Sequence, residues 1–519
     1  MASNTKEEIH VDNMFVDDVH DNFGGSAADR ADMLRMGKSQ ELRRNFRFMT
    51  IFGFSMILMQ SWEVSSSLAV IGLLNGGTAG VIWMFLICWV GLLLTNTSMA
   101  EMGSMAPTVG GQYHWVSEFA PRKHQRFLSY LMGWLCVLGW QVSCASAAYT
   151  TATQLQGLIV LNCPETYTYE NWHGTLITIA FAAFSVVFNT FFARKLPLLE
   201  GIVLIIHICA FVAFLITLWV LAPIADAKEV FTQFNDGGGW GNLGVSTLVG
   251  ITGSTLPLVG ADAAVHMSEE LKDASRTLPR TMIWSTILNG LMGWVMVITF
   301  CFTLGNLNEV LGSETGYPYI QVYYNATQSK GGATVMVVIV VFMSLLCNLT
   351  MVATASRQLF AFARDGGLPF RNWFQKIDPR WDVPLNAINT TFIVSTILSL
   401  IAIGSPVALN SIMSLATAGL LSSYICSISC MAWRRWTNNP LLPSKFSLGR
   451  WGLAINLSSL AFLLVVFVFS FFPTAPHPDA AGMNWTILIY GVVVLFCLGY
   501  YFVGKHEYTG PVEYVRKLE

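Results

Sequence analysis

The sequence predicts an all-α integral membrane protein of about twelve transmembrane helices. Its 519 residues are 54% hydrophobic and only 12% charged, with a mean hydropathy of +0.53. Typical soluble domains carry about 25% charged residues, so half of the usual charge is missing. Apolar runs of about 20 residues, the length that crosses ~30 Å of hydrocarbon, recur along the chain.

The twelve predicted spans give the chain three parts. A polar segment, residues 1–47, is expected to be a disordered cytosolic tail, because it has few apolar residues and lacks the apolar core of a signal peptide. Residues 48–503 form the membrane domain, and 504–519 a cytosolic C-terminal tail. The predicted spans are 48–74, 78–101, 126–160, 172–192, 198–222, 243–267, 281–305, 331–356, 384–404, 408–432, 452–472 and 484–503.

The distribution of basic residues predicts the orientation. With a cytosolic N-terminus, the tails and the loops after even-numbered spans, together with Arg126 at the start of the third span, hold 27 of the 29 Lys and Arg residues. The outer loops hold only Lys228 and Lys330. This asymmetry follows the positive-inside rule, and a change of one span would destroy it. Both termini are therefore expected in the cytosol.

Two spans contain residues that interrupt a helix. The first carries the polar stretch QSWEVSSS, residues 60–67, and the sixth carries Gly250, Gly253, Pro257 and Gly260. Interrupted spans at matching positions of two halves are typical of transporters with inverted repeats. The expected repeats are 48–222 and 243–432, with 452–503 as extra helices.

Three cytosolic motifs carry a family resemblance. They are PTVGGQYHWVSEFAP after the second span, EELKDASRTLP after the sixth and SRQLFAFARDGGLPF after the eighth. In this order they resemble the amino acid–polyamine–organocation transporters, in particular the fungal amino acid/choline branch with its GABA and choline permeases. The resemblance implies twelve spans with a five-plus-five inverted repeat. It also implies a substrate site between the broken first and sixth helices, for an amino acid or small amine that is often driven by protons.

The first break departs from that pattern. Many members of this family have a glycine-rich break whose backbone amides bind the substrate carboxylate, whereas Gln60–Ser67 contains no glycine and has Glu63 in the middle. Glu63 is interpreted as a proton carrier, as a counter-ion for a substrate ammonium, or as a neutral structural acid, because ionisable groups at this depth are costly. Asp262 is a second candidate for proton coupling, or a cap for the helix that follows the break.

The predicted substrate site combines polar and small residues from three spans. For each of them, helix packing and interhelical hydrogen bonding remain alternative roles. The candidates are Gln60, Trp62, Glu63, Ser65 and Ser66 from the first span, Gln141 from the third, and Thr255, Leu258 and Gly260 from the sixth. Glu269, Glu270, Arg276 and Arg364 are expected to form exchangeable cytosolic ion pairs.

Other classes of site find no support in the sequence. The ten cysteines show no metal-ligand spacing, so neither a metal nor a cofactor is expected. The net charge of −2 gives no basis for nucleic-acid binding, and no span holds a nucleophile–base pair, so no enzyme is expected. Sequons at Asn325 and Asn484 permit glycosylation.

The predicted function is secondary active import of an amino acid or small amine such as GABA, by proton symport with alternating access. A choline or polyamine carrier on the same scaffold is the first alternative, and a non-transporting nutrient receptor the second. The expected location is the plasma membrane, with the vacuolar membrane as the alternative.

Overall fold

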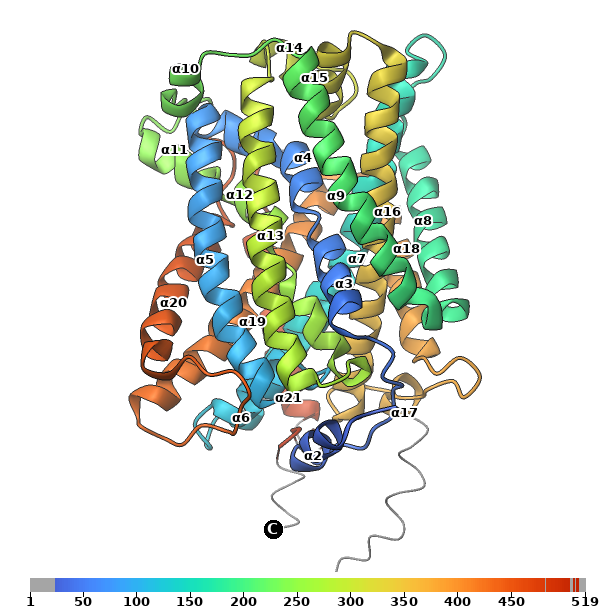
Figure 1. The fold of residues 1–519 in the computed structure, drawn as a ribbon, viewed down its shortest axis with the longest axis vertical. Coiled ribbons are helices and arrows are strands. Elements are labelled where there is room, and N and C mark those ends of the chain that lie inside the picture. The colour runs from blue at the N-terminus through green and yellow to red at the C-terminus, as the bar shows by residue number, and fades with distance from the viewer. Residues whose placement is uncertain (1–23, 481, 505–506, 509, 513–519) are drawn as a thin grey trace, which may run out of the picture.

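A bundle of long helices runs along the vertical axis of the computed structural model, which describes residues 24–480, 482–504, 507–508 and 510–512 (Figure 1). Eleven helices in this part of the chain are long and apolar enough to cross a membrane, and a bent pair makes the twelfth. The spans are α3 Phe48–Met59 with α4 Ser61–Leu74, α5 Gly77–Met105, α7 Gln125–Asn162, α8 Asn171–Phe191, α9 Leu196–Leu221, α11 Leu243–Val249 with α12 Ile251–Thr255, η4 Leu256–Leu258 and η5 Ala261–Glu270, α13 Ala274–Phe302, α16 Lys330–Arg364, α18 Leu385–Gly404, α19 Pro406–Trp436, α20 Gly452–Phe469 and α21 Thr486–Gly504.

Short helices close both ends of the bundle. One end carries α10 Ala227–Thr232, α14 Leu307–Leu311 and α15 Pro318–Thr327, and the opposite end carries α2 Ala27–Arg35, α6 Gln112–Phe119 and α17 Arg371–Phe374 (Figure 1). The second end holds the basic loops and is therefore the cytosolic one. The predicted fold class is confirmed. Some helices are longer than predicted because their polar ends leave the hydrocarbon: α16 continues eight residues past 356, and α13 begins at Ala274 rather than 281.

The first span is broken at a single residue. Gln60 has the left-handed backbone conformation, with φ of 41°, and separates α3 from α4. The prediction that residues 61–67 are unwound is wrong, since α4 begins at Ser61. The serine hydroxyls explain this: Ser66 donates to Trp62 O at 3.2 Å and Ser67 to Glu63 O at 3.2 Å, and such bonds to the preceding turn are compatible with a helix.

The sixth span is broken more extensively, as predicted. The chain bends by 44° at Gly250, between α11 and the helical segment that follows. Two residues then leave the helix: Val259 is extended, and Gly260 has φ of 117°, a conformation that favours glycine. The predicted interruption of the sixth span is therefore confirmed, and it is centred on Val259 and Gly260.

Glycines let the two broken spans touch through their backbones. A Cβ atom on Gly250 would lie 2.7 Å from the carbonyl oxygen of Asn75, and one on Gly253 would lie 3.0 Å from that of Leu68. The Ser61 hydroxyl donates to the Pro257 carbonyl at 2.6 Å. The outer half of the sixth span therefore lies directly on α4.

The segment before the first span folds under the bundle. The expectation that the whole tail is disordered is wrong for residues 24–47, which include α2; residues 1–23 lie outside the described part of the chain. The buried Asp29 accepts hydrogen bonds from the backbone N–H groups of Asp273 and Ala274, both at 3.1 Å. Asp29 thus caps α13, whose own N-cap residue makes no side-chain cap bond.

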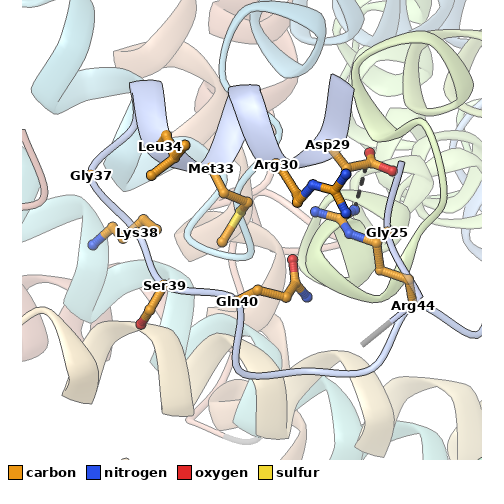
Figure 2. Close-up of a pocket in the computed structure, with 10 residues that line it drawn as sticks. All are labelled: Gly25, Asp29, Arg30, Met33, Leu34, Gly37, Lys38, Ser39, Gln40 and Arg44. Atoms are coloured by element: carbon orange, nitrogen blue, oxygen red, sulfur yellow. Dashed lines mark ion pairs between the residues drawn. The ribbon is translucent and has the colours of Figure 1, made fainter. Parts of the chain in front are cut away.

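Two basic residues of the same segment bind the ends of other spans. Arg44 lies 3.3 Å from Asp29 and donates to the carbonyls of Ser268 and Leu271, where η5 ends. Lys38 pairs with Asp365, just after α16. Figure 2 shows Asp29, Lys38 and Arg44 around a pocket of about 320 Å³ that is lined by α2 and the chain after it. The segment therefore connects the cytosolic ends of the sixth, seventh and eighth spans.

Gly250→Ala tests the backbone contact between the broken spans. The added methyl group requires α12 and α4 to separate, so we expect a loss of about 1–3 kcal/mol of stability, as in other overpacked sites. The measurement is the thermal unfolding midpoint of the purified protein in detergent. Gly499→Ala on α21, where a Cβ meets nothing within 4 Å, is the matched control, and equal midpoints for the two variants would contradict the contact.

Asp29→Asn tests the cap on α13. Burial alone would raise the pKa of Asp29, but Arg44 and the backbone N–H groups hold that pKa below its usual value. A depressed carboxyl pKa stabilises the fold above the unfolded-state value of about 4, and this contribution is lost as the pH falls through the folded-state pKa. The wild type should therefore unfold at a higher temperature than Asp29→Asn between about pH 5 and 8, with a difference that shrinks in acid. Glu41→Gln, in the same segment, is the control. If the difference in unfolding temperature between the wild type and Asp29→Asn stayed the same when the pH was lowered into the acid range, the assignment would be refuted.

Candidate functional site

The centre of the bundle, where the two breaks meet, is closed. Gln60, Ser61 and Thr255 are at most 3% exposed, and Leu258 is fully buried. Helix α16 seals the third side, since Ser344 donates to Gln60 Oε1 at 3.3 Å and the Cys347 thiol to the Leu58 carbonyl at 3.2 Å. The four buried side chains of the breaks are thus closed off from water, whereas Val259 in the sixth break is partly exposed.

Glu63 points away from the sixth span. Its Oε1 atom lies 2.8 Å from Nδ1 of His207 on α9, and both side chains are fully buried. Glu63 Oε2 and His207 Nε2 have no hydrogen-bond partner in the described chain. The two groups can share one proton, either as carboxylic acid and neutral imidazole or as carboxylate and imidazolium, and both forms have zero net charge. This answers how an acid is tolerated at such depth.

Trp62 competes for the same imidazole nitrogen. Its indole Nε1 lies 3.2 Å from His207 Nδ1. An indole N–H can only donate, and an imidazole nitrogen carries either one proton or one lone pair. When Nδ1 is protonated it can donate to Glu63, and the indole N–H then loses its acceptor. Protonation of Nδ1 therefore excludes Trp62, whereas an unprotonated Nδ1 can accept from the indole or from a protonated Glu63.

The ring of Trp62 is packed against α9 as well. Its centroid is 4.9 Å from that of Phe214, edge to face, and 6.1 Å from that of Phe211. The structure thus places Trp62 in an aromatic cluster with the fifth span rather than with the broken sixth span. Sequence reasoning overlooked His207, although an ionisable residue in an otherwise apolar span is itself a signal of function.

The hydroxyl candidates donate to their own helices. Ser65 donates to the Ser61 carbonyl and Ser66 to that of Trp62, while Thr255 donates to the Ile251 carbonyl at 2.9 Å. A hydroxyl that has used its one proton can still accept. Thr255 also lies 3.3 Å from the Cys88 thiol on α5, so the structure places it against the second span.

Asp262 belongs to a polar cluster below the sixth break. It accepts from Gln112 Nε2 at 2.7 Å and from the Tyr424 hydroxyl, and it lies 3.9 Å from His266 Nε2. Gly260 holds the N-cap position of η5, and Asp262 lies two residues later in its first turn. His266 Nδ1 is 2.8 Å from the Val109 carbonyl, and Nε2 accepts from the Trp140 indole at 3.1 Å. This arrangement fixes His266 as a neutral imidazole.

Gln141 lies with the scaffold helices. Its amide nitrogen donates to the Thr391 hydroxyl at 3.1 Å and is 3.5 Å from the Ala355 carbonyl. Those partners are on α18 and α16, so the structure does not bring this amide to the breaks. Gln112 and Tyr424, which bind Asp262, carried no signal in the sequence, since each is an ordinary polar residue until the fold brings it to a carboxylate.

The cytosolic acids and bases form ion pairs below this cluster. Arg364 binds both oxygens of Glu269, at 2.9 and 2.7 Å, and Arg357 binds Glu270 at 2.9 Å. These pairs tie the end of the sixth span to α16. The two predicted sequon residues lie at the other end of the molecule: Asn325 Nδ2 donates to Glu309 at 3.2 Å and Asn484 Nδ2 to the Ser470 carbonyl at 3.0 Å, and their glycosylation stays a prediction.

Comparison with known proteins agrees with this architecture. A family model described as amino acid permease matches residues 46–494. A candidate amino acid/polyamine transporter of Macrophomina phaseolina is 32% identical over 440 residues, which cover 84% of this chain and 96% of the relative. The choline transporter of Saccharomyces cerevisiae is 29% identical over 514 residues, 98% of this chain and 88% of the relative. Amino-acid permease 2 of Neurospora crassa is 26% identical over 481 residues, 92% and 88% of the two chains.

The predicted family is therefore confirmed over nearly the whole membrane domain. With its broken first and sixth spans in contact at mid-bundle, the chain belongs to the amino acid permease family of the amino acid–polyamine–organocation superfamily, and it is a multi-pass membrane transporter.

Proposed function

We propose that the chain imports a small solute carrying both an ammonium and a carboxylate, such as GABA or another amino acid, together with protons. The observation that carries this proposal is the geometry of α4. Its first turn begins at the break and leaves backbone N–H groups without partners in their own helix. A helix N-terminus of this kind favours a carboxylate.

Glu63 does not oppose a substrate carboxylate in this arrangement. The side chains of Ser61 and Glu63 point in directions about 200° apart around α4, at about 100° per residue. Ser61 reaches the sixth span, whereas Glu63 reaches His207 and shares its charge. The absence of glycine from the first break therefore does not exclude carboxylate binding.

The substrate ammonium has acceptors within the same region. Ser65 and Ser66 keep lone pairs, Gln60 offers an amide oxygen, and Val259 leaves the helix at the break. The Gly260 carbonyl already accepts from the Ala263 N–H at 3.0 Å and has one lone pair left. We propose Gln60, Ser65, Ser66, Leu258 and Gly260 as the substrate contacts. Trp62, Gln141 and Thr255 serve the surrounding helices in this proposal, and Asp262 serves cytosolic closure.

Choline transport is the second candidate, and the relative from Saccharomyces cerevisiae favours it. A quaternary ammonium has no N–H to donate and is recognised by aromatic faces. The Trp62 ring is packed edge to face with that of Phe214, and the Trp140 ring is packed against His266 with centroids 5.6 Å apart. The acceptor-rich break therefore favours a primary ammonium over choline.

Coupling follows from the two faces of α4. In the proposal, substrate binds the side toward the sixth span, and a proton binds the Glu63–His207 pair on the opposite side. The substrate side and Glu63 belong to the same turn of α4. Movement of the repeats 48–222 and 243–432 against each other would therefore carry the substrate and the proton together. A low external pH favours protonation of the Glu63–His207 pair from the outside, so uptake rises as the external pH falls.

The first experiment is uptake of labelled GABA, a neutral amino acid, choline and spermidine into cells that express the chain, at external pH between about 5 and 8, the range in which His titrates. We expect saturable uptake of an amino acid that rises toward low pH. Uptake of choline alone would support the second candidate. Saturable uptake of none of the four would contradict the proposal and leave a receptor role.

Glu63→Gln separates proton coupling from substrate charge balance. Gln cannot carry a proton, so we expect exchange of labelled substrate across the membrane to persist while the pH dependence of uptake disappears. A counter-ion role predicts instead a rise in KM of about tenfold or more for a cationic substrate, as one lost charge pair implies. Glu229→Gln, an exposed acid on α10, is the control, and a variant Glu63→Gln with unchanged rate and pH profile would show that Glu63 has neither role.

A further inference from the structure

A second buried acid lies on the same face of the fifth span as His207. Glu200 is 2% exposed and belongs to α9, seven residues before His207. Seven residues are close to two helical turns, so both side chains share the buried stripe of α9 about 10 Å apart. The opposite side of this helix is exposed and apolar, with Ile205 at 64% and Ile216 at 59%.

The hydrogen bonds around Glu200 fit a neutral acid. Its Oε1 atom is 3.0 Å from the Thr350 hydroxyl on α16, and that hydroxyl is also 3.0 Å from the Leu346 carbonyl. A hydroxyl has one proton. If Thr350 donates it to Leu346, the Glu200 O–H can donate to Thr350 Oγ1, and the chain of bonds is complete.

An ionised Glu200 has no comparable support. It makes no ion pair with any described residue, and its Oε2 atom has no hydrogen-bond partner in the described chain. The titratable groups nearest in the fold are Cys347 on α16, His207 on α9 and Glu63 on α4, with Arg194 and Lys195 before α9 at the cytosolic edge. An uncompensated carboxylate at this depth is far more costly than a hydrogen-bonded carboxylic acid.

Glu200 also lies where the first span meets the fifth. A Cβ atom on Gly53 would be 2.7 Å from the carbonyl oxygen of Glu200, so α3 and α9 are in backbone contact there. Helix α3 is the cytosolic half of the broken span. Any separation of α3 from α9 toward the cytosol would bring water to Glu200 before it reaches the Glu63–His207 pair.

We propose that Glu200 is a proton-binding residue that passes the coupled proton to the cytosol; this rests on the proton coupling of the proposed function. In the closed state Glu200 is protonated. When α3 moves off α9, water reaches the carboxyl, its O–H bond breaks, and the proton leaves to cytosolic water. A proton from the Glu63–His207 pair then crosses through the admitted water and forms a new O–H bond on Glu200. No electrons are exchanged.

Glu200→Gln, reconstituted in liposomes, tests the transport consequence with labelled GABA and labelled alanine as probes. Exchange of internal for external solute needs no net proton movement, so it should stay within about twofold of wild type, while accumulation driven by a pH gradient should fall by about tenfold or more. The exposed-acid variant Glu229→Gln should leave both rates unchanged. Unchanged accumulation in Glu200→Gln, or an equal loss of exchange and accumulation, would overturn the proposal.

Infrared difference spectroscopy of the purified protein tests protonation without transport. Because Glu63 can also carry a proton, the comparison uses the Glu63→Gln background. We expect the carbonyl stretch of a protonated carboxyl in Glu63→Gln, and a loss of intensity in this band when Glu200→Gln is added. Thr350→Val should shift this band, because the acceptor of the O–H is removed, and Thr350→Ser should restore it. If the wild type transports neither probe, the proposed function fails for those solutes, and the band alone decides on Glu200: a band that is unchanged when Glu200→Gln is added to Glu63→Gln overturns the assignment.

Discussion

The contact between the two broken spans is the constraint on which the rest of the structure depends. In hydrocarbon, a backbone group that leaves a helix needs another partner, so a break survives only where protein or a cavity supplies one. Here the breaks supply each other: Ser61 binds the Pro257 carbonyl, and Gly250 lets the sixth span lie on the end of α4. The cost of unwinding is thereby offset at the same place where polar backbone is needed for a solute.

The sequence was sufficient for the fold because membrane topology depends on composition. Span length, the placement of Lys and Arg, and the glycines of the sixth span are local properties, and each led to the correct element. The extent of the first break was not predictable in the same way. By propensity, serines favour a break in a helix, whereas Ser66 and Ser67 donate their hydroxyl hydrogens to carbonyls within α4. The residue with left-handed backbone at the first break is Gln60, and no helix propensity predicts that position.

The contact between the two breaks was predictable, but the pairing of Glu63 was not. Glu63 could be placed at mid-membrane from the sequence, yet its partner depends on how α9 is rotated, which only packing determines. His207 and Glu200 were nevertheless visible as ionisable residues in an apolar span. The folded segment 24–47 was missed for another reason. Its buried Asp29 and Arg44 are ordinary charges in the sequence, and they become structural only through the ends of η5 and α13.

These features together separate two tasks on one helix. The side of α4 toward the sixth span offers backbone donors and hydroxyl acceptors suited to a zwitterion, and the side toward α9 holds a carboxyl and an imidazole that share a proton. Because Trp62 and Glu63 compete for the same nitrogen of His207, gain or loss of the proton changes how α4 is held by α9. A change in that hold displaces Ser61 relative to Pro257, since both contacts belong to the first turn of α4. In the proposed mechanism, the proton therefore acts on the solute site through the orientation of α4 and needs no direct contact with the solute.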